Sequence, residues 1–195
     1  MRKLTSKKEM ERKSKRNQYL LGIALVVIMF GSVFGVIVGS FNSETKKEKI
    51  IYNGYEFIEQ NNYYLLTLGE VDFYFAEDPN EIFLLEKEVN LTKTLSSLIG
   101  QPIYISSIDY SPSREIYQNI VPYAERIQFA CLEDEICEDE NFPIKTCEDN
   151  LIIIIKEAEQ NKIYEKENCI FVEGKKEDLT KLTDELLFNL IGLNQ

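Results

Sequence analysis

The sequence predicts an N-terminal transmembrane helix followed by an α+β or α/β domain, whose mixed sheet begins with an antiparallel meander and packs with about three helices. Three observations predict this fold class. Residues 17–43 contain no Asp, Glu, Lys or Arg, and about 20 apolar residues suffice to cross a bilayer. Residues 50–76 alternate polar residues with aromatic and β-branched ones, as antiparallel strands do. Apolar strand-like segments then alternate with helical patterns toward the C-terminus.

The composition limits the chemistry that this chain can perform. It has 195 residues, of which 44% are hydrophobic and 28% charged, proportions typical of a folded domain. It contains no His, which excludes Ser-His-Asp and Cys-His catalysis and imidazole ligation of metals. The sequence also lacks a Gly-rich phosphate loop and a nucleophile elbow. We therefore expect a protein that is not an enzyme, with no catalytic residues, no cofactor and no metal.

The charge distribution predicts a topology. The first 16 residues carry eight Lys or Arg side chains and two Glu, a balance of +6, whereas the whole chain has a net charge of −11. A basic segment directly before an apolar span is retained in the cytoplasm. We expect a cytoplasmic segment over 1–16, a transmembrane helix over 17–43, a tether over 44–49 and an extracytoplasmic domain over 50–195. Clustered Lys and Arg also attract lipid or nucleic-acid phosphates, but nucleic acid is not an expected partner.

Two features of the apolar span leave alternatives open. Val38-Gly39-Ser40 offers the small residues of a signal-peptide cleavage site, although the apolar region exceeds the ~7–15 residues usual for a signal peptide. We favour the uncleaved anchor. Gly31, Gly35 and Gly39 recur every four residues and predict a stripe along which a second helix can pack closely. Glycine is, however, common in membrane helices in general.

Four cysteines lie in the predicted extracytoplasmic domain: Cys131, Cys137, Cys147 and Cys169. An even number of cysteines in an oxidising location indicates two disulfides. A four-thiolate zinc site is the alternative, but the spacing lacks its close C-x₂₋₄-C pairs. We favour Cys131–Cys137 with Cys147–Cys169. A plain hairpin of the strands over 151–156 and 169–173 would place Cys169 near Ile152, so this pairing requires either that the chain before Leu151 folds back or that the two strands do not form a plain hairpin.

The meander over residues 50–76 is rich in aromatic side chains. Such a sheet can bind a sugar or a peptide, or it can pack its aromatic residues into a core against a helix. The packing interpretation is favoured. The tyrosines that would form a binding face are Tyr52, Tyr55, Tyr63, Tyr64 and Tyr74.

Helices and buried strands alternate in the second half of the chain. We expect a short helix over 90–100, a strand over 102–108, and a helix from Ser111 that Pro122 kinks. Two uninterrupted apolar segments, 151–155 and 169–172, predict central strands. A final amphipathic helix ends at Gly192.

The segment from Leu132 to Asn150 is strongly acidic, with eight carboxylates and one Lys. Clustered oxygens can hold calcium, but the spacing does not match an EF-hand, and a solvated loop is the usual reason for such a run. Hydrolysis by two carboxylates is a distant alternative, because the sequence singles out no pair.

The cysteine-bearing half resembles small uncharacterised single-pass membrane proteins of archaea. The resemblance is carried by Ala130-Cys131, Cys137, the segment from Pro143 to Ile152, the segment from Asn168 to Gly174, and the segment from Leu182 to Leu187. It implies a surface-anchored protein with a framework of four cysteines, and it implies no activity.

From these features we expect a membrane-anchored extracytoplasmic domain that acts through protein–protein contacts at the cell surface. The expected partners are the lipid bilayer and another membrane or surface protein. A ligand- or glycan-binding module that uses the aromatic sheet is the main alternative, and a carboxylate-dependent hydrolase is the distant one.

Overall fold

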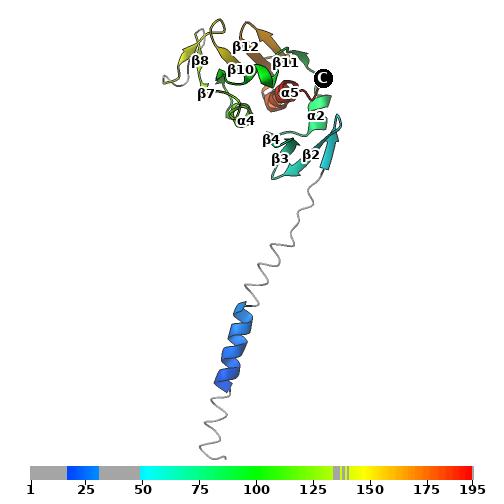
Figure 1. Ribbon diagram of the computed structural model, residues 1–195, viewed down its shortest axis with the longest axis vertical. Coiled ribbons are helices and arrows are strands. Elements are labelled where there is room, and N and C mark those ends of the chain that lie inside the picture. The colour runs from blue at the N-terminus through cyan, green and yellow to red at the C-terminus, as the bar shows by residue number, and fades with distance from the viewer. Residues whose placement is uncertain (1–16, 31–48, 134–136, 138, 140, 195) are drawn as a thin grey trace, which may run out of the picture. The chain divides into compact units, whose positions relative to one another are not determined.

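The computed structural model describes residues 17–30, 49–133, 137, 139 and 141–194 (Figure 1). The chain divides into two compact units, residues 1–46 and residues 47–195. In the first unit, residues 17–30 form a helix with exposed side chains.

The predicted transmembrane helix is contradicted. In the described part of the chain, no helix has both the length and the apolar character needed to cross a membrane. Gly31, Gly35 and Gly39 lie outside the described residues, as does the basic segment 1–16.

The second unit begins with a four-stranded antiparallel sheet in the order β1-β2-β3-β4. Its strands are β1 (Lys49–Tyr52), β2 (Tyr55–Gln60), β3 (Tyr63–Leu68) and β4 (Val71–Phe75). Tight turns connect them at Asn53-Gly54, Asn61-Asn62 and Gly69, where each named residue has a positive φ that Asn and Gly adopt readily. The predicted antiparallel meander is thus confirmed.

A second sheet has six strands in the order β5-β11-β12-β10-β6-β7. The neighbours β12, β10, β6 and β7 are parallel, whereas β11 runs antiparallel to β12. The strands are β5 (Glu88–Asn90), β6 (Pro102–Ser107), β7 (Arg126–Phe129), β10 (Leu151–Glu157), β11 (Lys162–Lys166) and β12 (Cys169–Gly174). A short parallel pair, β8 (Cys131–Leu132) and β9 (Ile144–Lys145), forms a third sheet.

The helices are α2 (Pro79–Leu84), α3 (Leu95–Leu98), α4 (Tyr110–Ile120) and α5 (Leu179–Ile191), with a 3₁₀ turn, η1 (Lys176–Asp178), before α5. The described residues of the domain thus contain four α-helices where about three were expected, and the helix over 17–30 is a fifth. Helix α4 begins after the cap Asp109 and ends at Ile120. Pro122 therefore follows the helix and does not kink it, in keeping with the missing N–H of proline.

The predicted single mixed sheet is also corrected, because two separate sheets enclose a layer of helices. Helices α4 and α5 lie between the meander and the six-stranded sheet (Figure 1). One core cluster joins Phe57 and Phe75 of the first sheet, Ile153 of the second, and Phe188 of α5, each with 0% exposure. Burial of this apolar surface from three layers holds the unit together.

Candidate functional site

Helix α4 covers the free edge of β4. The side-chain amide of Asn119 accepts a hydrogen bond from the Tyr74 N–H at 2.8 Å and donates one to the Tyr74 carbonyl at 2.7 Å. One side chain thereby takes both bonds that a neighbouring strand would make, and it protects an edge that would otherwise be open to pairing.

Two buried carboxyl groups continue this attachment beyond the strand. Glu115 of α4 accepts from the Ala76 N–H at 2.7 Å, and Asp184 of α5 accepts from the Glu77 N–H at 2.9 Å. The remaining oxygens, Glu115 Oε2 and Asp184 Oδ1, are buried. Neither oxygen has a hydrogen-bond partner among the described residues, and the two carboxyl groups lie close enough to influence each other's titration. Because a carboxylate only accepts, a direct hydrogen bond between them requires a proton on one of the two.

The electrostatics of this carboxyl pair favour that shared proton. Burial raises the pKa of Glu115 to about 7, although the hydrogen bonds from Asp184 and Ala76 act in the opposite direction. Burial also raises the pKa of Asp184, and the charge of Glu115 raises it further. The negative charge of Glu77 raises the pKa of both groups. Like charges so close cannot both ionise cheaply, so the pair titrates as a unit.

The carboxyl pair serves the fold. Paired-carboxylate hydrolysis requires a cleft that separates the two groups by ~5–10 Å, whereas both of these groups are buried and each is held by a backbone amide. Glu115 reaches only a small hollow of about 60 Å³ beside Tyr63 and Tyr74. The geometry therefore does not support the distant hydrolase alternative.

A crevice lies at the carboxyl ends of β6 and β10. After β6 the chain enters α4 and continues to β7 on one side, whereas after β10 it turns toward β11 and β12 on the other side. Neighbouring parallel strands whose connections leave in opposite directions create a crevice, and ligands of open α/β sheets bind at such points. The observed hollow there has a volume of about 210 Å³.

The lining of this crevice is mainly apolar. It is made by Ile105–Ile108, Phe129–Cys131, Phe142 and Ile154–Lys156. The rings of Phe129 and Phe142 stack with their centroids 5.9 Å apart. Ile108 at the rim is 58% exposed and Phe142 is 37% exposed. The polar groups are already engaged, because the Ser107 hydroxyl donates to the Asp109 carbonyl and Lys156 pairs with Glu173 at 3.2 Å.

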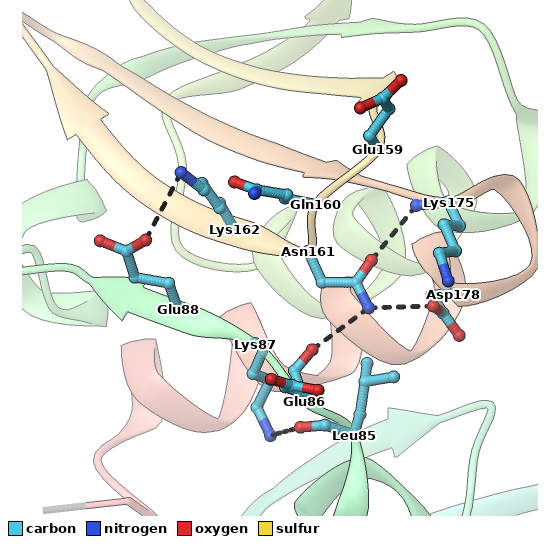
Figure 2. A pocket seen from close by; sticks show the side chains of 10 residues that line it. All are labelled: Leu85, Glu86, Lys87, Glu88, Glu159, Gln160, Asn161, Lys162, Lys175 and Asp178. Carbon is cyan, nitrogen blue, oxygen red and sulfur yellow. Dashed lines mark hydrogen bonds and ion pairs between the residues drawn. The ribbon is translucent and has the colours of Figure 1, made fainter.

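Other hollows have larger volumes but different properties. The one in Figure 2 has a volume of about 530 Å³ and a charged lining. Its centre is Asn161, whose amide donates to Asp178 at 2.9 Å and to the Glu86 carbonyl at 3.3 Å, and whose oxygen accepts from the Lys175 N–H. These bonds fix the turn between β10 and β11. Asn161 therefore stabilises the fold, whereas the exposed apolar residues at the rim of the crevice have no such role in the hydrogen bonds described above.

The five tyrosines proposed as a binding face do not share one face. The strand register places Tyr52, Tyr55 and Tyr64 on the side of the meander that faces the core, with Tyr52 only 7% exposed. Tyr63 and Tyr74 lie on the opposite side. The rings of Tyr52 and Phe188 stack at 5.6 Å, as expected for core packing.

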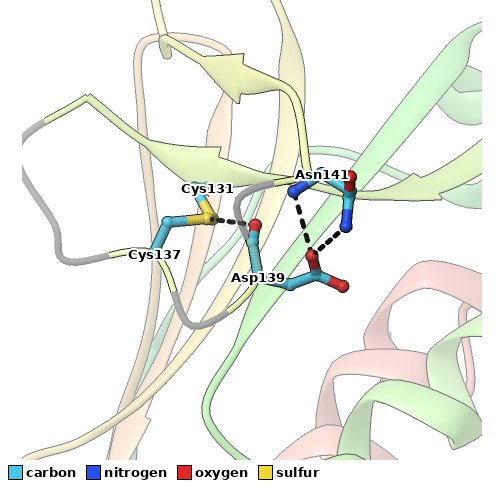
Figure 3. The surroundings of a disulfide bond; sticks show 4 residues. All are labelled: Cys131, Cys137, Asp139 and Asn141. Carbon is cyan, nitrogen blue, oxygen red and sulfur yellow. Dashed lines mark hydrogen bonds between the residues drawn. A yellow bond between two sulfur atoms is a disulfide. The ribbon is translucent and has the colours of Figure 1, made fainter.

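Two disulfides are present, with the pairing that the sequence favoured: Cys131–Cys137 and Cys147–Cys169. The second bridge is reached because β10 and β12 are parallel neighbours, so the residues before both strands meet at the same edge. In Figure 3, the Asp139 carboxylate beside the Cys131–Cys137 disulfide accepts two hydrogen bonds from Asn141. Disulfides of this kind indicate an extracellular or otherwise oxidising environment.

Within the described residues, no group of three or more Cys, Asp or Glu side chains is arranged to hold a metal ion. Several carboxylates of the acidic segment, including Asp134, Glu135, Glu138 and Glu140, lie outside the described residues.

No protein family model, curated protein or solved structure matches this chain. The resemblance to archaeal membrane proteins therefore stays a prediction.

The sequence reasoning missed the carboxyl pair and the crevice. The crevice had one signal, the strand at 102–108 followed by a helix and a second buried strand at 151–155, which is the pattern of a parallel sheet. The carboxyl pair had no such signal in the sequence, because no local pattern shows that residues 115 and 184 lie close together.

Proposed function

We propose that residues 47–195 form a binding domain that works in an oxidising compartment by contacting another protein, and that the crevice between β6 and β10 receives an apolar side chain of that partner. The observation that carries the proposal is an apolar, aromatic-lined hollow at a topological switch point with an exposed apolar rim. Binding energy at protein interfaces concentrates in a few anchor side chains that fill such hollows.

The volume favours an anchor side chain over a whole ligand. Pockets for small molecules and cofactors usually have volumes of about 300–1,000 Å³, and the crevice, with about 210 Å³, lies below this range. Ile144, which pairs with Cys131 of the crevice wall, is 66% exposed and extends the apolar surface. Exposed apolar residues that gather around a hollow are typical of protein contact sites.

The charge of the region indicates the chemistry of the partner. The acidic segment from Leu132 to Asn150 lies next to the crevice in the chain, since Cys131 and Phe142 are part of its wall. The whole chain carries a net charge of −11, and an excess of carboxylates attracts a basic partner and disfavours an acidic one. We therefore infer a partner that combines an apolar anchor with a basic surround.

Photocrosslinking in the native cells tests this proposal. Ile108 of the full chain is replaced by p-benzoylphenylalanine, and the matched control carries the same replacement at Ile99, which is 56% exposed against 58% for Ile108. We expect one discrete protein adduct from position 108 and none of that mass from position 99. Equal adducts from both positions, or only lipid or glycan adducts from position 108, contradict a protein-binding crevice.

A second pair of variants tests the anchor hollow itself. Adding Phe142→Asp to the position-108 variant places a charge in the wall and should abolish the adduct. Phe83→Asp changes a residue that is 67% exposed in α2, outside the crevice, and should leave the adduct unchanged. Loss of the adduct in both variants would mean that the effect is not specific to the crevice.

A further inference from the structure

Tyr104 of β6 brings two cations together. It lies on the face of the six-stranded sheet opposite α4 and is only 2% exposed. Arg126 donates a hydrogen bond to the Tyr104 hydroxyl at 2.6 Å, and its guanidinium carbon lies 5.6 Å from the centre of the ring. The Lys145 ammonium lies 4.6 Å from the same centre. One aromatic ring thus holds two positive charges by cation–π contact.

This arrangement is unusual for a chain with 33 acidic and 22 basic side chains. Several other cations of the domain pair with carboxylates, as Lys93 does with Glu165 at 3.1 Å. Among the ion pairs of the described residues, none involves Arg126 or Lys145. Because both cations lie against the same ring, their positive charges repel each other, and an anion that contacts both would stabilise the arrangement.

The titration of Tyr104 agrees with uncompensated positive charge. Burial alone would raise the pKa of its phenol above 10.0, yet the hydrogen bonds and the charges of Lys145 and Arg126 outweigh burial and lower it. The leading electrostatic contributions thus come from these two cations. The hydroxyl therefore lies in a positive potential.

We propose that Arg126 and Lys145, positioned against the ring of Tyr104, form a binding site for a tetrahedral oxyanion of the phosphate or sulfate class. Arg126 is exposed and Lys145 is half-buried, so both cations can be reached from solvent. A guanidinium has five donors in a fixed fork, of which the structure uses one for Tyr104. The others and the ammonium protons supply charge-assisted hydrogen bonds to the oxygens of an anion.

Two positive charges match a doubly charged anion better than a carboxylate. The phosphate or sulfate can be a free ion or an ester on a carbohydrate, because an ester keeps three terminal oxygens on the tetrahedral centre, although a sulfate ester carries only one negative charge. This site does not depend on the crevice, since none of its three residues lines that hollow.

The test is an NMR titration of the full chain labelled with ¹³C at tyrosine Cζ, in which Tyr104→Phe assigns the resonance of Tyr104. Sodium phosphate, sodium sulfate, glucose 6-sulfate and sodium acetate are added at an ionic strength held constant with sodium chloride. We expect phosphate or sulfate to shift the Tyr104 resonance with saturation and to raise the pH at which this phenol ionises. A stronger effect of glucose 6-sulfate than of free sulfate identifies the ester as the source.

Charge-removing variants complete the test. Arg126→Gln and Lys145→Gln should each weaken phosphate binding at least about tenfold, the loss of one charge-assisted hydrogen bond. Arg126→Lys, which keeps the charge, should fall between the wild type and Arg126→Gln. Lys166→Gln, which removes an exposed cation from β11, should not change the affinity. An equal response to chloride or acetate, or an equal loss in Lys166→Gln, overturns the proposal.

Discussion

Replacing Glu115 by glutamine should change how the stability of the domain depends on pH. In the wild type the carboxyl pair needs one proton, because Glu115 and Asp184 face each other in a buried space. The introduced amide keeps the shape of the side chain, accepts from the Ala76 N–H in the same way, and supplies a permanent N–H toward Asp184. The variant therefore retains the hydrogen bonds and loses the titration.

The size of the effect follows from the pKa of Glu115. Its value rises from 4.5 to about 7 on folding, and a difference of one pKa unit corresponds to about 1.36 kcal/mol. The folded state holds the proton more tightly than the unfolded state does. The stabilisation is therefore fully present below about pH 4.5 and is lost as the pH rises through about 7. Over this window we expect the wild type to lose about 3 kcal/mol relative to Glu115→Gln.

Urea unfolding of the full chain with intact disulfides measures this difference. The chain has 11 Tyr and no Trp, so tyrosine fluorescence reports the transition. The free energies of unfolding of the two proteins should diverge between pH 4.5 and about 7 and stay at a constant difference at higher pH. Parallel curves over the whole window would refute a raised pKa of Glu115 in the folded state.

Glu165 provides a control, because its pKa is lowered in the folded state and its effect on stability therefore depends on pH in the opposite direction. Burial would raise the pKa of its carboxyl, but hydrogen bonds from the Lys93 and Thr92 backbone and the charge of Lys93 lower it. Its contribution is present above the unfolded pKa and is lost as the pH falls through the folded pKa. Relative to Glu165→Gln, the wild type should therefore lose stability toward acid. A loss toward high pH in this control would mean that the difference at Glu115 has another cause.

Three further changes test the fold around the site by urea unfolding at neutral pH. Asn119→Ala leaves the edge of β4 unpaired and should cost about 2–4 kcal/mol, whereas Asn141→Ala, an exposed control, should cost less than about 0.5 kcal/mol. The Cys147–Cys169 disulfide has a sequence separation of 22, and its removal should cost about 3 kcal/mol. The Cys131–Cys137 disulfide has a separation of 6, and its removal should cost about 2 kcal/mol. A larger loss for the shorter loop would contradict an origin in loop entropy. Gly174→Ala should cost about 1–3 kcal/mol because its Cβ would overlap Leu182 and the Asn161 side chain, and an unchanged stability would show that this packing yields easily.

The sequence was informative where a local pattern decides the structure. Asn53-Gly54 fixes a hairpin because both residues adopt positive φ. The uninterrupted apolar run at 151–155 predicts a strand covered on both faces, and Ile152 to Ile155 are all buried. The number and spacing of the cysteines indicated two disulfides but left three pairings possible, and the favoured pairing is the one observed.

The prediction failed where the surroundings of an element decide its role. Helix α5 was expected to bury one stripe, but it lies between two sheets, so Thr183, Asp184 and Glu185 are buried with the apolar residues. Asp184 therefore becomes half of a carboxyl pair with Glu115, which lies far earlier in the chain, and only the tertiary fold shows this. The transmembrane prediction for 17–43 failed because no helix of the described residues is long and apolar enough to cross a membrane, a property that an uncharged composition alone does not ensure.

The two disulfides lie at different ends of the six-stranded sheet. The Cys147–Cys169 bridge joins the amino ends of β10 and β12, where a covalent link fixes the register of the central strands. The crevice lies at the carboxyl end of β10, with Cys131 in its wall. The short Cys131–Cys137 bridge therefore restrains a binding surface, while the longer bridge restrains the core. Because a short loop removes less chain entropy than a long one, the Cys131–Cys137 bridge adds less to global stability than the other, and its main physical effect is to hold the wall of the crevice in the conformation that a partner would meet.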